Sequence, residues 1–509
     1  MEFDFEDKEF QNALDFIQTN ESFFLTGKAG TGKSTLLRHI VDTTEKNFFV
    51  VAPTALAANN IRGKTIHSFF QFPIRPLLLE DEDIKIWEEF SPKRRIISAL
   101  DTLIIDEVSM VSADLIDGID YSLRRNGGNP NLPFGGKQVV FIGDIFQLQP
   151  ITDSQSDAQQ KINETYGGQC YFYKAKVFER INEIPKIELQ KSYRQTDSKF
   201  IALLDKVRVY ETSQLDLDKL NSRVFSDTEL KKKEFVVTLA ARIDAANEFN
   251  WGKLSDLKTD PFIYKAAVKD IFPQKNYPTE DELILKEGAQ VMFIKNDLDG
   301  RWVNGTVGQV HELTATAIKV KLEDGEIHNV SKVVWDNVKY KASKKRNKFD
   351  EDVIGTFEQY PLKLAWAITI HKSQGLTFDK VLIDFGYGAF ASGQAYVALS
   401  RVKNFEGLFL KQEIRKSDIL VDEELKEFAK SFNDKSLIHQ RLEEGKKNLN
   451  PVVKFNNETL RGAVREWIED ESEAKQKYGH ISDWDTSEVT DMSELFLDAK
   501  HFNSPIRDW

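Results

Sequence analysis

Short apolar runs alternate with stretches of helical periodicity over the first 180 residues. The runs occupy residues 22–26, 48–51, 103–105 and 139–142, and Leu36, Leu37, Ile40 and Val41 follow the first run at helical spacing. Buried parallel strands have this continuous apolar character, and helices connect them. The pattern predicts a parallel α/β domain over residues 1–185.

The apolar runs return at residues 235–239 and 381–384 and predict a second α/β domain from residues 186–287 and 356–450. Between these parts, residues 289–294, 306–310 and 318–322 alternate like short antiparallel strands. We therefore expect a small β-barrel insert at 288–355. Residues 153–168 are expected to form a surface loop. The basic run 341–348 is interpreted as a solvated loop, with a nucleic-acid contact as the open alternative.

Composition narrows the class of protein. The chain has 509 residues, 41% of them hydrophobic, which predicts several folded domains. It has no apolar stretch of bilayer length and no signal-peptide pattern, so we expect no membrane partner and an intracellular location, cytoplasmic or nuclear. The single cysteine, Cys170, excludes a disulfide framework.

The net charge of −12 does not by itself favour a nucleic-acid binder. However, residues 451–509 contain 7 Lys or Arg and 13 Asp or Glu. This segment therefore carries half of the chain's excess of negative charge. The rest of the chain is nearly balanced, so a local basic groove is compatible with the composition.

One segment fits the phosphate-loop pattern G-x-x-x-x-G-K-[ST]. Its glycines let backbone N–H groups point at phosphate oxygens, and the helix that follows presents its positive end to them. Lys33 is expected to reach the β- and γ-phosphates of ATP, and the Ser34 hydroxyl to ligate Mg²⁺. The predicted nucleotide-binding residues here are Gly27, Ala29, Gly30, Thr31, Gly32, Lys33, Ser34 and Thr35.

Two acids end the apolar run at residues 103–105. Asp106 is placed to hold Mg²⁺, and Glu107 is placed to polarise the attacking water. The alternative to a catalytic role is a strand that simply ends in two solvated acids. Together with the phosphate loop, the pair predicts binding and hydrolysis of a nucleoside triphosphate.

Further segments resemble a known family in their order and spacing. They are residues 53–70, the Asp106-Glu107 strand, Gly143–Leu148, Tyr193-Arg194-Gln195, residues 365–378 and Tyr396–Val402. They resemble the motifs of superfamily-one DNA helicases of the Pif-one/RecD-like, 5′-to-3′ branch. The resemblance spans roughly residues 8–415. It implies two RecA-like domains with parallel sheets, an ATP cleft between them and an SH3-like β-barrel insert in the second.

The resemblance also implies roles for individual residues. Arg194 and Arg401 would act as arginine fingers, and Gln147 would contact the γ-phosphate or its water. Gly375 would lie at the nucleotide. Phosphate contacts to DNA would come from Thr54, His67, Ser68, His371, Lys372 and Ser373. Phe69 or Phe70 could stack on a base, and the alternative is that both belong to the core.

The family usually reads adenine with a glutamine before the phosphate loop. Here Phe10 is interpreted as occupying that position, with Gln11, the predicted base contact, one residue later. Adenine selectivity is therefore left open.

The resemblance implies ATP-driven unwinding of duplex DNA by a monomeric motor that binds single-stranded and forked DNA. DNA repair, recombination and telomere maintenance are settings typical of the family, and the sequence does not select among them. A translocase that separates no strands, and a nucleotide-dependent switch without a nucleic-acid track, are the alternatives. Residues 67–95 are the expected strand-separating wedge.

The C-terminal segment 451–509 lies outside the helicase pattern. Trp484–Ser493, Phe502-Asn503 and Trp509 resemble one unit of BspA-like leucine-rich repeats. One such unit cannot bury its own apolar face. We expect it either to belong to a longer array or to dock on the body, as an appendage for a protein partner.

Overall fold

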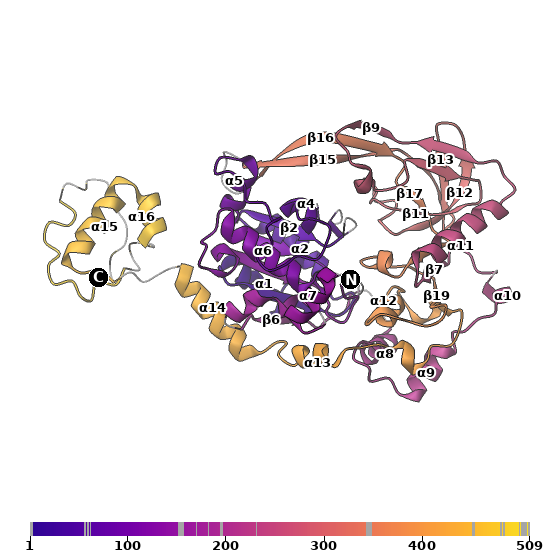
Figure 1. The fold of residues 1–509 in the computed structure, drawn as a ribbon, viewed down its shortest axis with the longest axis horizontal. Helices are drawn as coiled ribbons and strands as arrows, with labels where there is room; N and C mark the ends of the chain where they lie inside the picture. The colour runs from indigo at the N-terminus through magenta and orange to yellow at the C-terminus, as the bar shows by residue number, and fades with distance from the viewer. Residues whose placement is uncertain are drawn as a thin grey trace.

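The structure is a computed structural model, and Figure 1 shows its two α/β domains, its β-rich insert and its C-terminal unit. It describes residues 4–54, 57–58, 61, 63–150, 157–168, 170–181, 183–193, 197–230, 232–342, 349–449, 454–478, 481, 484–497, 499 and 506. Within these residues, no helix combines the length and the apolar character that a membrane span requires.

The first domain is built on a parallel six-stranded sheet in the order β3-β2-β4-β5-β1-β6. The strands are β1 (Phe23–Gly27), β2 (Phe48–Ala52), β3 (Lys64–Thr65), β4 (Thr102–Ile105), β5 (Gln138–Ile142) and β6 (Lys186–Leu189). The helices are α1 (Lys8–Gln18), α2 (Lys33–Thr43), α4 (Ile66–Phe70), α5 (Pro92–Ala99), α6 (Ala113–Arg125) and α7 (Asp157–Tyr166). β1, β4 and β5 are entirely buried, as expected for a sheet covered on both faces.

Two sequence predictions for this domain were wrong. Strand β6 pairs in parallel with β1 and so belongs to the first sheet, although the second domain was expected to begin at residue 186. The expected loop at 153–168 contains α7, whose Ile162 and Tyr166 are buried in the first-domain core. Residues 151–156 of that stretch lie outside the described part.

The second domain has a parallel four-stranded sheet in the order β18-β7-β19-β20. Its strands are β7 (Val237–Ala240), β18 (Ala367–Thr369), β19 (Val381–Asp384) and β20 (Leu408–Leu410), and its helices are α8 (Ser198–Arg208), α9 (Gln214–Asn221), α10 (Asp227–Leu230), α11 (Ile243–Asp256) and α12 (Gln394–Leu399). Both sheets therefore confirm the predicted α/β class.

The chain then returns to the first domain through α13 (Glu423–Ala429) and α14 (Lys435–Leu449). Ile438 and Leu442 of α14 share a core cluster with Phe16 of α1. Between the two helices, the Asn433 side chain exchanges hydrogen bonds of 2.8 and 2.9 Å with the backbone of Glu188. Residues 423–449 therefore pack on the first domain, whereas the sequence assigned them to the second.

The insert contains an antiparallel five-stranded sheet, β14-β13-β12-β11-β17. These strands are β11 (Gln290–Phe293), β12 (Val307–Leu313), β13 (Ile318–Leu322), β14 (Ile327–Val330) and β17 (Leu362–Leu364). Smaller sheets pair β8 (Phe262–Lys265) with β10 (Glu282–Leu285), and β9 (Ala267–Asp270) with the hairpin of β15 (Val333–Ala342) and β16 (Phe349–Gln359). The strands thus begin before residue 288 and end after 355, beyond the predicted bounds.

The hairpin β15–β16 reaches across the top of the molecule to α5 of the first domain (Figure 1). There the Lys64 ammonium donates a 2.5 Å hydrogen bond to the Val338 carbonyl. Helix α5, whose first residues 92–95 end the predicted wedge segment 67–95, therefore lies beside β15. Residues 343–348 of the basic run are outside the described part.

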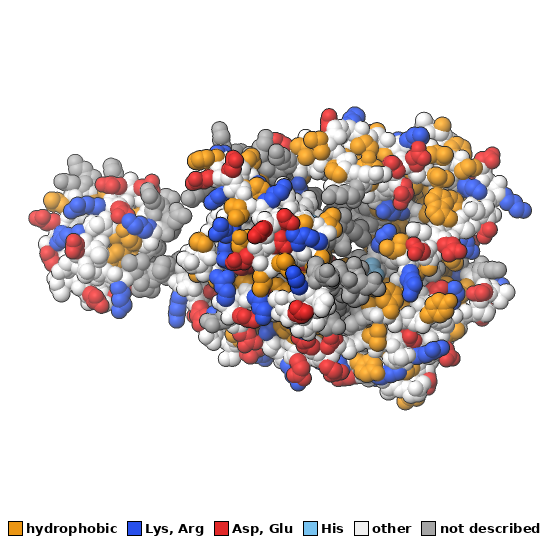
Figure 2. Space-filling view, in the orientation of Figure 1, with side chains coloured by type: hydrophobic (Ala, Val, Ile, Leu, Met, Phe, Trp, Pro, Cys, Tyr) orange, Lys and Arg blue, Asp and Glu red, His pale blue; other side chains and the backbone are white. Residues whose placement is uncertain are grey.

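The C-terminal unit stands apart from the body in Figures 1 and 2. It consists of α15 (Asn457–Glu469), α16 (Glu471–Tyr478) and irregular chain. Its own core cluster is formed by Phe455, Leu460, Ala463, Val464, Trp467, Ala474, Ile481 and Trp484. Trp484, the first residue of the segment that resembles a repeat, is therefore buried against the helices of the unit itself. Trp509 and Phe502-Asn503 are not among the described residues.

Candidate nucleotide and nucleic-acid site

The phosphate loop joins β1 to α2. Gly30 and Gly32 have φ angles of 83° and 89°, in the left-handed region that glycine tolerates without strain. A Cβ on Gly27 would lie 2.5 Å from Thr31 Oγ1, so this position also requires glycine. The glycine spacing of the sequence therefore reflects the local backbone of the turn.

The side chains of the loop are arranged around its own carbonyl oxygens. Lys33 Nζ donates hydrogen bonds of 2.6 Å to the Gly27 carbonyl and 3.0 Å to the Lys28 carbonyl. Thr31 is buried and donates to the Lys28 carbonyl at 3.0 Å. Ser34 is exposed in the first turn of α2, and Thr35 beside it is half-buried. Lys33 and the exposed Ser34 hydroxyl thus lie next to the helix N-terminus.

Asp106 and Glu107 follow β4. Asp106 is buried, and this burial, with the charge of Glu107, raises the pKa of Asp106 to about 7 despite the opposing charge of Lys33. Glu107 adopts a φ of 50°, and its N–H donates to Asp106 Oδ1 at 2.9 Å. This turn directs the two neighbouring carboxylates differently, one into the domain and one to its partly exposed surface.

A magnesium ion would find a sparse donor set here. Among the residues that the structure describes, no three His, Cys, Asp or Glu side chains are grouped for a metal ion. Mg²⁺ typically takes one or two protein oxygens and completes its shell with water and substrate phosphates. Ser34 and Asp106 fit that pattern, provided that a nucleotide supplies the remaining ligands.

The second domain reaches the phosphate loop directly. The Ala29 N–H donates a 2.9 Å hydrogen bond to the Tyr396 hydroxyl of α12. Lys28 forms a 2.7 Å ion pair with Asp205 of α8. The Tyr193 N–H, in the segment between the domains, donates to the Gly30 carbonyl at 2.8 Å. Sequence analysis did not assign Tyr396 or Asp205, although Tyr396 begins one of the motif segments that it singled out.

Gln147 lies at the domain junction. Its Nε2 approaches Asp144 Oδ2 at 3.4 Å, and its Oε1 accepts from Gln374 Nε2 of the second domain at 3.4 Å. A Cβ on Gly393, which precedes α12, would lie 2.6 Å from the Gln147 carbonyl. The two domains therefore meet in backbone contact at this point.

The predicted arginine finger Arg401 is bound within its own domain. Arg401 is only 1% exposed, and its guanidinium donates to the Val397, Ser373 and Leu376 carbonyls and to the Ser400 hydroxyl. All four partners belong to the second domain, so a finger role would require Arg401 to exchange them. Arg194 lies outside the described residues. Gly375 is exposed with a φ of 77° and lies one residue beyond Gln374.

In the segment before the phosphate loop, Phe10 and Gln11 have different environments. Phe10 is 1% exposed and packs in the core with α1 and β1, so it cannot take the place of a base-reading glutamine. Gln11 is exposed, and its Nε2 donates to the Phe5 carbonyl at 2.6 Å. The Phe5 ring lies 4.6 Å from His39 of α2. Gln11 is therefore the residue available for a base contact.

Candidate DNA contacts come from both domains. His67 and Ser68 lie on α4, whose start is capped by Thr65, and Thr54 Oγ1 accepts from the Ala57 N–H. Lys372 is exposed, and burial lowers the pKa of the neighbouring His371. These five residues remain accessible at least in part.

Three residues weighed for DNA contact are internal. Ser373 is fully buried and its hydroxyl donates to the Ile370 carbonyl at 2.7 Å, which argues against a direct phosphate contact from its side chain. Phe69 and Phe70 are 1% and 0% exposed and pack in the first-domain core, so the core alternative holds for both.

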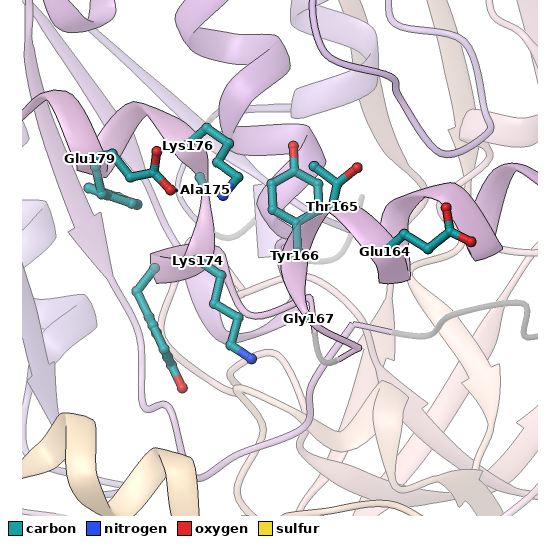
Figure 3. Close-up of a pocket in the computed structure, with 10 residues that line it drawn as sticks. Glu164, Thr165, Tyr166, Gly167, Lys174, Ala175, Lys176 and Glu179 are labelled. Carbon is teal, nitrogen blue, oxygen red and sulfur yellow. Dashed lines mark hydrogen bonds and ion pairs between the residues drawn. The ribbon is translucent and has the colours of Figure 1, made fainter.

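A separate pocket of about 610 Å³ lies between the end of α7 and residues 173–179 (Figure 3). Its two lysines are paired, Lys174 with Glu424 and Lys176 with Glu179. None of the predicted site residues lines it. The candidate chemistry therefore lies at the domain junction and not in this pocket.

Comparison with family models gives three matches. The model of PIF1-like helicase matches residues 7–218, and a model described as Helicase, from herpesviruses, matches residues 330–425. Residues 464–509 match a family described as Mycoplasma protein of unknown function, DUF285. The helicase matches thus cover segments of both α/β domains.

Curated relatives and solved structures agree with the first match. The chain is 33% identical over 430 residues to the ATP-dependent DNA helicase Pif1 of Bdellovibrio bacteriovorus, covering 83% of this chain and 91% of that protein. It is 32% identical to the PIF1 of Xenopus laevis, covering 78% of this chain but 59% of the relative. The structure of Bacteroides sp Pif1 in complex with ADP-AlF4 matches with a TM-score of 0.75 and 34% identity, covering 84% of this chain and 97% of that chain. The structure of Bacteroides Pif1 bound to single-stranded DNA matches with a TM-score of 0.61 and 35% identity, at the same coverage of the two chains.

Proposed function

Because the chain belongs to the PIF1-like helicases, we propose that it is an ATP-dependent DNA helicase that moves 5′ to 3′ along single-stranded DNA and unwinds duplexes. The observation that carries the proposal is the contact of the phosphate loop with the second domain through Ala29 and Tyr396. Nucleotide bound at that loop lies where two domains meet, so its binding and hydrolysis can change their separation.

The nucleotide site uses residues of the first domain. Lys33 exchanges its loop carbonyl partners for the β- and γ-phosphates, and the N–H groups of residues 30–35 surround them. Ser34 and Asp106 hold Mg²⁺, which neutralises phosphate charge when bound. Glu107 orients and deprotonates the attacking water. Gln11 contacts the base.

The second domain supplies the response to the γ-phosphate. Gln147 already bridges Asp144 and Gln374 across the junction. A change in the contacts of its amide therefore affects residues of both domains. Arg401 is proposed as a finger that leaves its own-domain partners when the cleft closes on ATP. Arg194 is proposed for the same role from its sequence position.

Single-stranded DNA is proposed to cross Thr54, His67 and Ser68 on the first domain and His371 and Lys372 on the second. Hydroxyls, backbone amides and a lysine bind phosphates without reading bases. On the face drawn in Figure 2, acidic and basic side chains are interspersed. The motor unit is proposed to be a monomer, with the C-terminal unit available to a protein partner.

The test compares forked duplexes that carry a 5′ or a 3′ single-stranded tail, with ATP and Mg²⁺. We expect unwinding only from the 5′ tail and none for Lys33→Ala. Unwinding from the 3′ tail alone would overturn the proposed direction. The alternative, a translocase without strand separation, predicts ATP-dependent displacement of streptavidin from a single strand and no unwinding of either fork.

A further inference from the structure

A continuous chain of buried polar contacts runs from the phosphate loop into the second domain. The Tyr396 hydroxyl accepts from the Ala29 N–H at 2.9 Å and donates to Asp144 Oδ2 at 3.1 Å. Tyr396 is 3% exposed and Asp144 is 0% exposed. One hydroxyl of α12 therefore joins two separate parts of the first domain, the loop after β1 and the turn after β5.

The carboxylate of Asp144 is neutralised by the second domain as well. Arg208, at the end of α8, donates to Asp144 Oδ1 through Nε and Nη2 at 3.2 and 3.1 Å, and to Glu188 through Nη1 at 2.9 Å. Burial alone would raise the pKa of Asp144, but the positive charges of Arg208 and Lys33 hold it below its ordinary value. Tyr396 is thus the hydroxyl donor to an ionised, fully buried acid.

The other end of α12 leads to the DNA side of the second domain. One residue after Tyr396, the Val397 carbonyl accepts from Arg401 Nε at 2.9 Å. The Arg401 guanidinium then donates to the carbonyls of Ser373 and Leu376. These carbonyls flank the turn that follows His371 and Lys372, the proposed phosphate contacts. Arg401 therefore ties α12 to this turn until it leaves these partners for ATP.

A second set of contacts connects Asp144 to the same turn. Asp144 contacts Gln147, and Gln147 accepts from Gln374 of the same turn. The close approach of Gly393 to the Gln147 carbonyl leaves no space between the start of α12 and the first domain. The helix thus contacts the first domain at its start and is tied to the turn through Arg401.

We infer that Tyr396 is a positioning residue that couples occupancy of the phosphate loop to the DNA-binding turn at residues 371–376. The inference rests on the proposed function, because it concerns how ATP hydrolysis and DNA binding communicate. Tyr396 touches the loop backbone next to the nucleotide, and its hydroxyl is the shared partner of Ala29 and Asp144. Loss of that hydroxyl separates the loop from α12 without removing a nucleotide ligand.

Tyr396→Phe removes the hydroxyl and keeps the buried ring. Tyr166→Phe is a matched control, since the Tyr166 hydroxyl also donates to a buried acid, Asp117, at 2.7 Å, but entirely within the first domain. A general loss of stability from a buried tyrosine hydroxyl would appear in both variants. A loss of communication would appear in Tyr396→Phe only.

The experiment measures ATP turnover of the full chain with and without a single-stranded oligothymidylate, together with thermal midpoints. For Tyr396→Phe we expect the ratio of DNA-stimulated to basal kcat to fall about tenfold, the range set by one lost buried hydrogen bond, and KM for ATP to stay within about twofold. Tyr166→Phe should keep the wild-type ratio.

A wild-type ratio in Tyr396→Phe overturns the inference. A proportional fall of basal and stimulated turnover also overturns it, because that pattern indicates a structural role. Absence of DNA stimulation in the wild-type chain overturns the proposed function instead, so the two failures are distinguishable.

Discussion

Lys33 Nζ and the Gly27 carbonyl lie 2.6 Å apart, so the phosphate-loop lysine is bound to its own loop in this structure. ATP must replace that contact with its β- and γ-phosphates. Lys33→Ala removes the charge that meets them, and we expect hydrolysis to fall by at least about 100-fold. Phosphate release in the presence of single-stranded DNA measures the effect.

Lys176→Ala is the control for loss of a lysine charge, since Lys176 pairs with Glu179 away from the loop. It should retain wild-type turnover. If Lys33→Ala hydrolysed ATP at a comparable rate, the assigned nucleotide site would be wrong.

The elements predicted well from the sequence are those that local chemistry defines. The glycine spacing at 27, 30 and 32 specifies a turn that only this residue type forms easily, and the apolar runs specify buried strands. The alternation in residues 289–322 likewise predicted the strands of the insert. These features depend on neighbours in the chain and are therefore visible without a structure.

The errors concern contacts between distant segments. Strand β6 was assigned to the second domain, yet its partner is β1, more than 150 residues earlier. The apolar face of α14 predicts burial but not the surface that buries it, which is α1. Arg401 was expected at the nucleotide because of its motif, and only the packed domain reveals the carbonyls that it binds.

Arg401→Lys tests the finger role with the charge kept. A lysine cannot reproduce the planar fork of arginine at a phosphate. We expect nucleotide affinity to be retained and DNA-stimulated turnover to fall by about 10³-fold. Binding of a fluorescent ATP analogue and steady-state turnover separate the two quantities.

The thermal midpoint must be followed in the same variant, because Arg401 donates at least four buried hydrogen bonds. Turnover that falls only in proportion to the folded fraction would assign Arg401 a structural role. A loss of turnover at an unchanged midpoint would support the finger role.

The environment of Lys93 predicts that the stability of the protein depends on pH. Its ammonium lies 3.4 Å from the centroid of the Phe69 ring, and burial, together with the charge of Lys64, lowers the pKa of Lys93 from 10.5 to about 7. Between these two pH values the unfolded chain binds more protons than the folded chain. The free energy of unfolding should therefore rise as the pH increases from about 7 to 10.5.

Lys93→Met removes this half-buried titrating group, so its thermal midpoint should rise less with pH than that of the wild type. Each kcal/mol corresponds to about 2 to 4 °C in a domain of this size. Lys85→Met, at an exposed lysine of the same region, should follow the wild-type profile. Identical profiles for wild type and Lys93→Met would contradict the prediction.

The C-terminal unit should be dispensable for the motor. Its core is separate from those of the helicase domains, and the Trp484 ring packs against Phe455 at 4.6 Å and Trp467 at 5.7 Å within the unit. Deletion of residues 454–509 should leave DNA-stimulated ATP turnover and unwinding within about twofold of the full chain. The proposed appendage for a protein partner requires this result.

Deletion from residue 434 onward is the contrasting truncation. It removes α14 in addition, and with it the buried Ile438 and Leu442 that pack beside α1. Loss of two large buried side chains typically costs several kcal/mol, so this variant should melt at a lower temperature and lose activity. Equal loss of turnover in both truncations would show that the unit contributes to the motor, since only one of them removes α14.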